Sequence, residues 1–160
     1  MIIKCQQVVK KYSNKVVLDN VDLDVEQGEF FGLVGMNGSG KSTLIKAVLD
    51  LVGIDSGKIE IDKTPHRKVN ARENIAYLPD RFSPPAHLRG QDFIQYMLRL
   101  HSSSCEPQEI EKILDGLELD KTVMRESVNK LSKGMTQKLG LASCLLSGKS
   151  ILILDEPMSG

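Results

Sequence analysis

The sequence is constrained most by a glycine-rich stretch at residues 35–42, which fits the pattern G-x-x-x-x-G-K-[ST]. Glycines let the backbone curl so that successive N–H groups point inward at an anionic phosphate chain. Such a loop needs a strand before it and a helix after it. The apolar run at residues 30–34 predicts a buried strand. The helix is predicted by apolar residues at helical spacing: Leu44, Ile45, Val48, Leu49 and Val52.

The residues of this loop have separate expected roles. The helix N-terminus adds partial positive charge for the phosphates. Lys41 is expected to reach the β- and γ-phosphates, and the Ser42 hydroxyl to ligate Mg²⁺, which prefers hard oxygen ligands. The alternative is a glycine-rich turn that binds no ligand. The predicted nucleotide contacts are Gly35, Asn37, Gly38, Ser39, Gly40, Lys41, Ser42 and Thr43.

Composition narrows the class of protein further. The 160 residues, 41% hydrophobic and 26% charged, predict one globular domain. Lys plus Arg and Asp plus Glu both number 21, so no net charge attracts the chain to nucleic acid. The alternative is a local basic patch on the surface. No apolar run approaches a membrane span and no signal peptide is evident, so we expect a cytoplasmic protein. Cys5, Cys105 and Cys144 lack metal-ligand spacing, which predicts buried or incidental thiols.

The start of the chain is rich in predicted strands and its middle is helical. Alternating or β-branched apolar residues predict strands over residues 2–9, 16–25, 58–61 and 74–78. Helical spacing predicts helices near residues 93–100, from Pro107, near Leu119 or Asp120, and over residues 136–146. The wholly apolar run at residues 151–154 is typical of a central parallel strand buried on both faces.

Asp155 and Glu156 follow this last strand, at the strand end where ligands bind in open α/β sheets. Four hydrophobic residues and then Asp is a weak nucleotide-site signature alone and a strong one beside a phosphate-binding loop. We expect Asp155 to hold Mg²⁺ through water. Glu156 is expected to orient or deprotonate the water that attacks the γ-phosphate. The alternative makes Glu156 a solvated loop carboxylate.

Three segments occur in a fixed order with a helical insert between them: GMNGSGKST, LSKGMTQ and ILILDEP. On these segments the whole chain resembles the ATP-binding subunits of ABC transporters, with LSKGMTQ in the place of the family's LSGGQ signature. The resemblance implies an α/β fold with a P-loop NTPase (RecA-like) core, N-terminal antiparallel β strands and an inserted α-helical subdomain. It divides a single ABC ATPase domain into a core at residues 1–79 and 145–160 and a helical subdomain at roughly residues 80–144.

The resemblance also implies roles outside the loop. Tyr12 matches the aromatic residue that stacks on adenine, and the alternative is a partly exposed turn tyrosine. Ser132 and Gly134 match signature residues that donate to the γ-phosphate bound by the partner subunit, at a helix N-terminus suited to anions. By itself LSKGM is only a good helix start. Lys133 departs from the family's first Gly, and Met135 departs from its Gln.

Asp80 follows Tyr-Leu-Pro at a position where the family usually has Gln. In the family this position contacts Mg²⁺ and the attacking water, and it links the core to the helical subdomain. A carboxylate can also meet Mg²⁺. Tyr-Leu-Pro followed by an acid looks like the exporter branch, which pumps small molecules, polysaccharides or maturation substrates. The alternative is a turn aspartate after Pro79.

The end of the chain departs from the family pattern. Ser159 and Gly160 match the start of the loop after the second motif, but its expected Asp and the later switch His do not follow. His66, His87 and His101 all precede the signature. We therefore expect a C-terminally truncated piece of the family's domain, which by itself binds nucleotide weakly and hydrolyses it negligibly.

The resemblance implies an ATP-hydrolysing motor subunit with ATP and Mg²⁺ as its cofactors. A homodimer, or a pair with another ABC ATPase subunit, would assemble head to tail and drive transport through a separate transmembrane permease, at the cytoplasmic face of the membrane. No nucleic-acid partner is expected. The alternative is a soluble ABC-type ATPase acting on nucleic acid or ribosomes. Such proteins usually carry a second cassette or a coiled-coil insert, so the short helical insert favours transport, and LSKGM disfavours a P-loop kinase.

Overall fold

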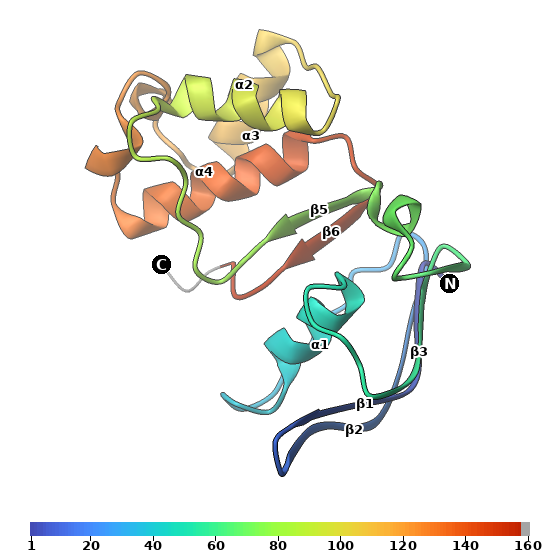
Figure 1. Ribbon diagram of the computed structural model, residues 1–160. Coiled ribbons are helices and arrows are strands. Elements are labelled where there is room, and N and C mark those ends of the chain that lie inside the picture. The colour runs from blue at the N-terminus through green and yellow to red at the C-terminus, as the bar shows by residue number, and fades with distance from the viewer. Residues whose placement is uncertain (158–160) are drawn as a thin grey trace. The chain divides into compact units, whose positions relative to one another are not determined.

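The computed structural model describes residues 1–157 and divides into two units of continuous sequence (Figure 1). The first unit is Met1–Glu73, and the second starts at Asn74. Ser159 and Gly160, which match the start of the family's next loop, lie outside the described residues.

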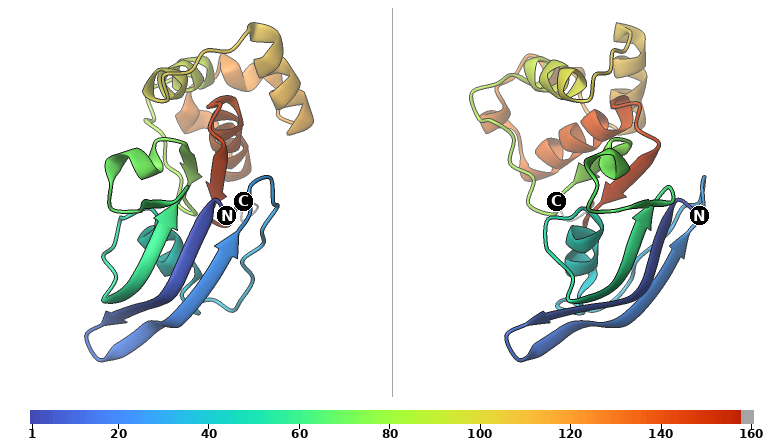
Figure 2. Two further views of the ribbon diagram at one scale, coloured as in Figure 1. Left: turned by 90° about the vertical axis from the view of Figure 1, so that its right-hand side faces the viewer. Right: turned by 45° about the vertical axis from the view of Figure 1, so that its right-hand side comes forward.

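The first unit is built on an antiparallel sheet, as the sequence predicted. Its strands lie in the order β2-β1-β3-β4, and Figure 2 shows the three long ones side by side in a curved sheet. Lys15 pairs with Tyr12 across the hairpin turn between the first two strands. The strand bounds are β1 (Ile3–Tyr12), β2 (Lys15–Val25), β3 (Ser56–Ile61) and β4 (Thr64–Pro65).

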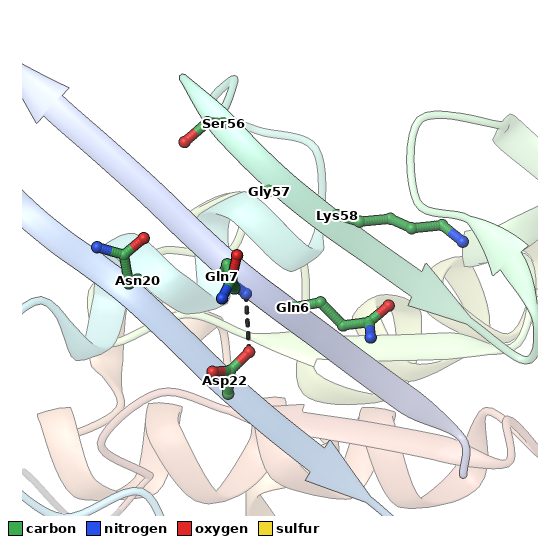
Figure 3. A pocket seen from close by; sticks show the side chains of 7 residues that line it. All are labelled: Gln6, Gln7, Asn20, Asp22, Ser56, Gly57 and Lys58. Atoms are coloured by element: carbon green, nitrogen blue, oxygen red, sulfur yellow. Dashed lines mark hydrogen bonds between the residues drawn. The ribbon is translucent and has the colours of Figure 1, made fainter.

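The middle of β1 is irregular, because bulges interrupt its pairing with both neighbouring strands. Gln7 takes a left-handed backbone conformation there, with φ of 47°, and its N–H donates to Asp22 Oδ1 at 2.8 Å (Figure 3). Gly57 on β3 has φ of 92°, and a Cβ at this position would collide with the carbonyl oxygen of Gln7. The bulge therefore requires glycine on the neighbouring strand.

Helix α1 (Lys41–Val48) follows the glycine-rich loop and buries Leu44, Ala47 and Val48. Its end is tied to the 3₁₀ helix η1 (Val69–Arg72), because the carboxylate of Asp50 lies 3.4 Å from the Arg72 guanidinium. The predicted helix is confirmed, and it ends before the predicted apolar series does.

The strand predicted at residues 30–34 is wrong. These residues form no strand, Val34 is 94% exposed, and Phe30 is fully exposed. A parallel strand is held by hydrogen bonds to neighbouring strands, and no strand in residues 1–157 pairs with this segment. The apolar composition of this segment is typical of a sheet interior, but without partner strands the segment is irregular and exposed.

The second unit contains a parallel pair of strands, β5 (Ile75–Leu78) and β6 (Ile151–Leu154). Ala76 and Leu78 of β5 pack with Cys144 of a helix that lies along the pair, labelled α4 in Figure 1. The parallel pairing is confirmed. The expected burial of β6 on both faces is wrong at Leu152, which is 39% exposed.

The rest of the second unit is a helical layer. Phe93, Ile94 and Leu139 are almost fully buried at its centre, where helices α2 and α3 pack on helix α4. Its helices are α2 (Gly90–Leu100), α3 (Pro107–Gly116) and α4 (Lys133–Leu146), with 3₁₀ helices η2 (Lys121–Met124) and η3 (Val128–Lys130). The helix starting at Pro107 is confirmed. The one near Asp120 is a 3₁₀ turn, and α4 begins three residues earlier than predicted because Ser132 caps it.

We predict that Gly57→Ala destabilises the first unit by about 2 kcal/mol or more, because a left-handed L-residue is strained and its Cβ meets the Gln7 carbonyl. Gly53→Ala is the matched control, since a Cβ there meets nothing within 4 Å. Urea unfolding of both variants measures the difference. Equal stabilities would show that the bulge adapts to a side chain.

Candidate functional site

The loop before α1 depends on glycine where its backbone is left-handed. Gly38 has φ of 81°, and Gly40, the N-cap of α1, has φ of 99°. A Cβ at Gly40 would lie 2.8 Å from the Val17 carbonyl oxygen and 3.1 Å from the Leu18 side chain. No side chain caps α1 at Gly40. The backbone N–H groups at such a helix start are suited to an anion.

Lys41 lies across this loop. Its Nζ donates to the carbonyl oxygens of Gly35 at 2.7 Å and Met36 at 3.1 Å, which holds the ammonium group over the loop backbone. A Cβ at Gly35 would lie 2.8 Å from Ser39 Oγ, so the curl is too tight for a side chain there. A positive charge, a glycine cradle and an uncapped helix N-terminus together fit a polyphosphate. Ser42 and Thr43 are in the first turn of α1, as predicted.

Asp155 stands directly after β6 and is 5% exposed. Its N–H donates to the Leu78 carbonyl oxygen at 2.9 Å, which extends the parallel ladder by one residue and fixes the backbone under the carboxylate. Over residues 1–157 no three His, Cys, Asp or Glu side chains gather into a metal site. The single buried carboxylate of Asp155 fits Mg²⁺, which takes one or two carboxylates and completes its shell with phosphates and water.

Glu156 is exposed, and its backbone is left-handed with φ of 49°. This conformation costs an L-residue about 1–2 kcal/mol and turns the chain immediately after the buried Asp155. Adjacent carboxylates thus have different environments, one enclosed at the strand end and one open to solvent. Sequence alone did not predict this backbone reversal.

Tyr77, near the end of β5, is a residue that sequence reasoning did not select. Partial burial raises the pKa of its phenol, and the negative charges of Asp155 and Asp80 raise it further. The second unit therefore brings Tyr77, Asp80 and Asp155 into one electrostatic neighbourhood. The sequence did not point to Tyr77, because a single sequence does not reveal which strands pair.

Tyr12 is the last residue of β1, beside the hairpin turn, and is 46% exposed. The ammonium group of Lys10 lies 5.0 Å from the centre of its ring. The ring is accessible and faces the Lys10 ammonium group. This environment fits both a tyrosine that stacks on a base and an ordinary turn tyrosine. Stacking on adenine stays a prediction.

The LSKGM segment forms the start of α4. Ser132 is the N-cap, and its Oγ accepts a hydrogen bond from the Met135 N–H at 3.2 Å. Lys133 and Gly134 make the first turn. The helix start expected from this segment is confirmed. Donation by Ser132 and Gly134 to a phosphate stays a prediction, as do the metal roles of Ser42, Asp80 and Asp155.

The cysteines do not add chemistry to this site. Burial raises the pKa of the Cys5 and Cys144 thiols to about 11, so both stay protonated near neutral pH and are poor nucleophiles. The prediction of buried thiols is confirmed for these two. Cys105 is only half-buried and has no disulfide partner in the described residues.

The structure thus defines a P-loop NTPase of the α/β class, with the loop and α1 in one unit and the strand pair ending at Asp155 in the other. A solved ATP-binding subunit of an ABC transporter is 26% identical, with a TM-score of 0.82, over 99% of this chain and 68% of its own. A cassette solved as a dimer in a post-hydrolysis state with ADP and Pi is 22% identical, with a TM-score of 0.83, over 98% of this chain and 75% of its own.

The chain belongs to the ABC transporter family, whose model matches residues 18–159. The Nod factor export ATP-binding protein I of Burkholderia pseudomallei is 33% identical over 97% of this chain and 52% of its own length. An Fe(3+) ions import ATP-binding protein of Fusobacterium nucleatum is 29% identical over 98% of this chain and 43% of its own. The chain therefore spans about half the length of the curated relatives it matches.

We predict that Ser132→Ala lowers the free energy of unfolding of the second unit by about 1 kcal/mol, because the α4 N-cap loses its acceptor. Ser132→Asp should retain most of the stability, since a carboxylate also caps and favours a helix N-terminus. Chemical denaturation of both variants measures the effect. Equal losses would show that the cap is not what Ser132 contributes.

Proposed function

We propose that this chain is the ATP-binding and ATP-hydrolysing part of an ABC transporter subunit. The observation that carries the proposal is the position of Lys41, whose ammonium group lies over a glycine cradle at the uncapped start of α1. A polyphosphate can replace the two backbone carbonyls as the partner of this ammonium group, because it offers stronger, charged acceptors. Family membership supports ATP as the source of that polyphosphate.

The remaining residues take their roles from this arrangement. We propose that Tyr12 stacks on adenine, that Lys41 contacts the β- and γ-phosphates, and that the loop N–H groups hold the phosphate chain. Mg²⁺, when bound, neutralises charge that develops on the phosphates. Ser42, Asp155 and Asp80 would supply its oxygen ligands.

Hydrolysis requires a base near the γ-phosphate. Glu156 is the proposed base, because its carboxylate is exposed beside the buried Asp155 and can accept a proton from the water that attacks in line. The proposed transfer moves the water's proton to Glu156 while the water oxygen bonds to phosphorus and ADP leaves. Residues 1–79 and 145–160 are the proposed core for this chemistry, and roughly residues 80–144 the helical subdomain.

A head-to-tail dimer, of two copies or with another ABC ATPase subunit, is proposed to complete the site. Ser132 and Gly134 at the start of α4 would donate to the γ-phosphate held by the other subunit. The related cassette solved as a dimer with ADP and Pi supports such a pair. ATP binding would close the dimer, and hydrolysis would open it.

The membrane partner is proposed to be a separate permease at the cytoplasmic face. None of the helices in residues 1–157 has the length and apolar character that a bilayer span requires. Export is the proposed direction, because Tyr-Leu-Pro-Asp resembles the exporter branch and the 33% identical relative is named for Nod factor export.

The phosphate assignment predicts that Lys41→Ala weakens ATP binding about 10- to 100-fold, since a hydrogen bond to a charged group contributes about 1.5–3 kcal/mol. Lys46→Ala is the matched control, because Lys46 is exposed later on the same helix. Calorimetry with ATP, on the protein that carries this chain, gives the affinities. Equal binding by the two folded variants would contradict the assignment.

The base assignment predicts that Glu156→Gln binds ATP normally but hydrolyses it at least about a hundredfold more slowly, because the amide cannot accept the water's proton. ATP-bound dimer should then accumulate. Glu118→Gln is the control, since Glu118 is also exposed and left-handed, with φ of 51°.

Phosphate release and size-exclusion chromatography with ATP and Mg²⁺ measure the two effects. Rapid turnover by Glu156→Gln would place the base elsewhere. Slow turnover without a dimer would contradict the proposed closure by ATP.

A further inference from the structure

Lys10 and Tyr12 are in contact near the end of β1. They are two residues apart, and side chains two apart on a strand share a face. The Lys10 ammonium group lies over the Tyr12 ring, 5.0 Å from its centre, which is within the range of a cation–π interaction. The ring is 46% exposed. One side of the ring therefore holds the protein's own cation, while part of the ring stays accessible to another planar group.

This end of the hairpin packs against the phosphate-binding loop. Lys10 pairs with Leu18 of β2, and the next pair skips Val17, which is an extra residue on β2. Gly40 of the loop approaches both β2 residues, since a Cβ there would meet the Val17 carbonyl oxygen at 2.8 Å and the Leu18 side chain at 3.1 Å. Residues paired across antiparallel strands point to the same face. Lys10 therefore shares with Leu18 the face of the sheet against which the loop lies.

The lysine restricts what the tyrosine ring can do. The face of an aromatic ring carries partial negative charge, so the ammonium group is attracted to it and favours one orientation of the ring. A side chain that is already ordered loses less freedom when a ligand binds. Lys10 also fills the side of the ring that it covers. A base that stacks on Tyr12 therefore has one side of the ring to approach.

We propose that Lys10 is a positioning residue for the nucleotide base, whose ammonium group holds the Tyr12 ring in one orientation and leaves its other side as the platform on which the base stacks. This inference rests on the proposed function, in which Tyr12 stacks on adenine. Lys10 acts through the ring and not on the phosphates. Its contribution therefore appears with a ligand that carries a base and vanishes with a bare phosphate chain.

The test uses the protein that carries this chain and measures by calorimetry the binding of two ligands, a non-hydrolysable ATP analogue and inorganic tripolyphosphate. Lys10→Met removes the charge and keeps an unbranched side chain, whereas Lys10→Arg keeps a cation that also interacts with aromatic rings. Lys11→Met is the matched control, because Lys11 is exposed and, as the next residue of the strand, projects to the other face. We expect Lys10→Met to weaken binding of the analogue about two- to fivefold and to leave tripolyphosphate binding unchanged. Lys10→Arg and Lys11→Met should bind both ligands as the wild type does.

Tyr12→Ala separates the inference from the proposed function. If Tyr12→Ala binds the analogue as the wild type does, the stacking role fails and the inference fails with it. If Tyr12→Ala weakens analogue binding and Lys10→Met does not, the positioning role of Lys10 is wrong and the stacking role stands. An equal loss of analogue and tripolyphosphate binding by Lys10→Met would mean that Lys10 serves the phosphates or the fold, which overturns the proposal. In the double variant, Lys10→Met should add no loss to that of Tyr12→Ala, and additive losses would also overturn the proposal.

Discussion

The close approach of Gly40 to the backbone of β2 is the constraint on which the first unit depends. The missing side chain at the α1 N-cap lets the loop lie against the Val17 carbonyl and the Leu18 side chain. The same left-handed residue starts the helix without a capping side chain, as a helix start suited to an anion would. A side chain at Gly40 would disturb the packing of the loop on β2.

In the second unit, two acids follow directly after strand β6. Parallel pairing of β5 and β6 aligns their carboxyl ends, and α4 covers one face through Cys144. The ladder continues to the N–H of Asp155, whose side chain is buried, and the next residue, Glu156, is left-handed and exposed. One strand end therefore carries two acids with different surroundings, one buried and one exposed.

Local patterns predicted some elements well and one element badly. The phosphate-binding loop, α1 and the capped start of α4 follow from glycines, a lysine and Ser132, whose effects act within a few residues. The segment at residues 30–34 has the same apolar character as β6, yet it is exposed and forms no strand. The difference is the partner: β6 pairs with β5 across more than seventy residues of chain, a distance over which sequence pattern carries no information about pairing.

The sequence by itself determined the conformation of the loop, because left-handed turns need glycine, and it placed Lys41 next to a helix start. It also determined that Asp155 ends an apolar strand. Tertiary structure alone decided that Asp155 and Asp80 act on the Tyr77 phenol and that Glu156 is left-handed. The physical reason is range: backbone conformation and capping are set by neighbours in sequence, whereas side-chain neighbourhoods arise from strand register, which long-range hydrogen bonds fix.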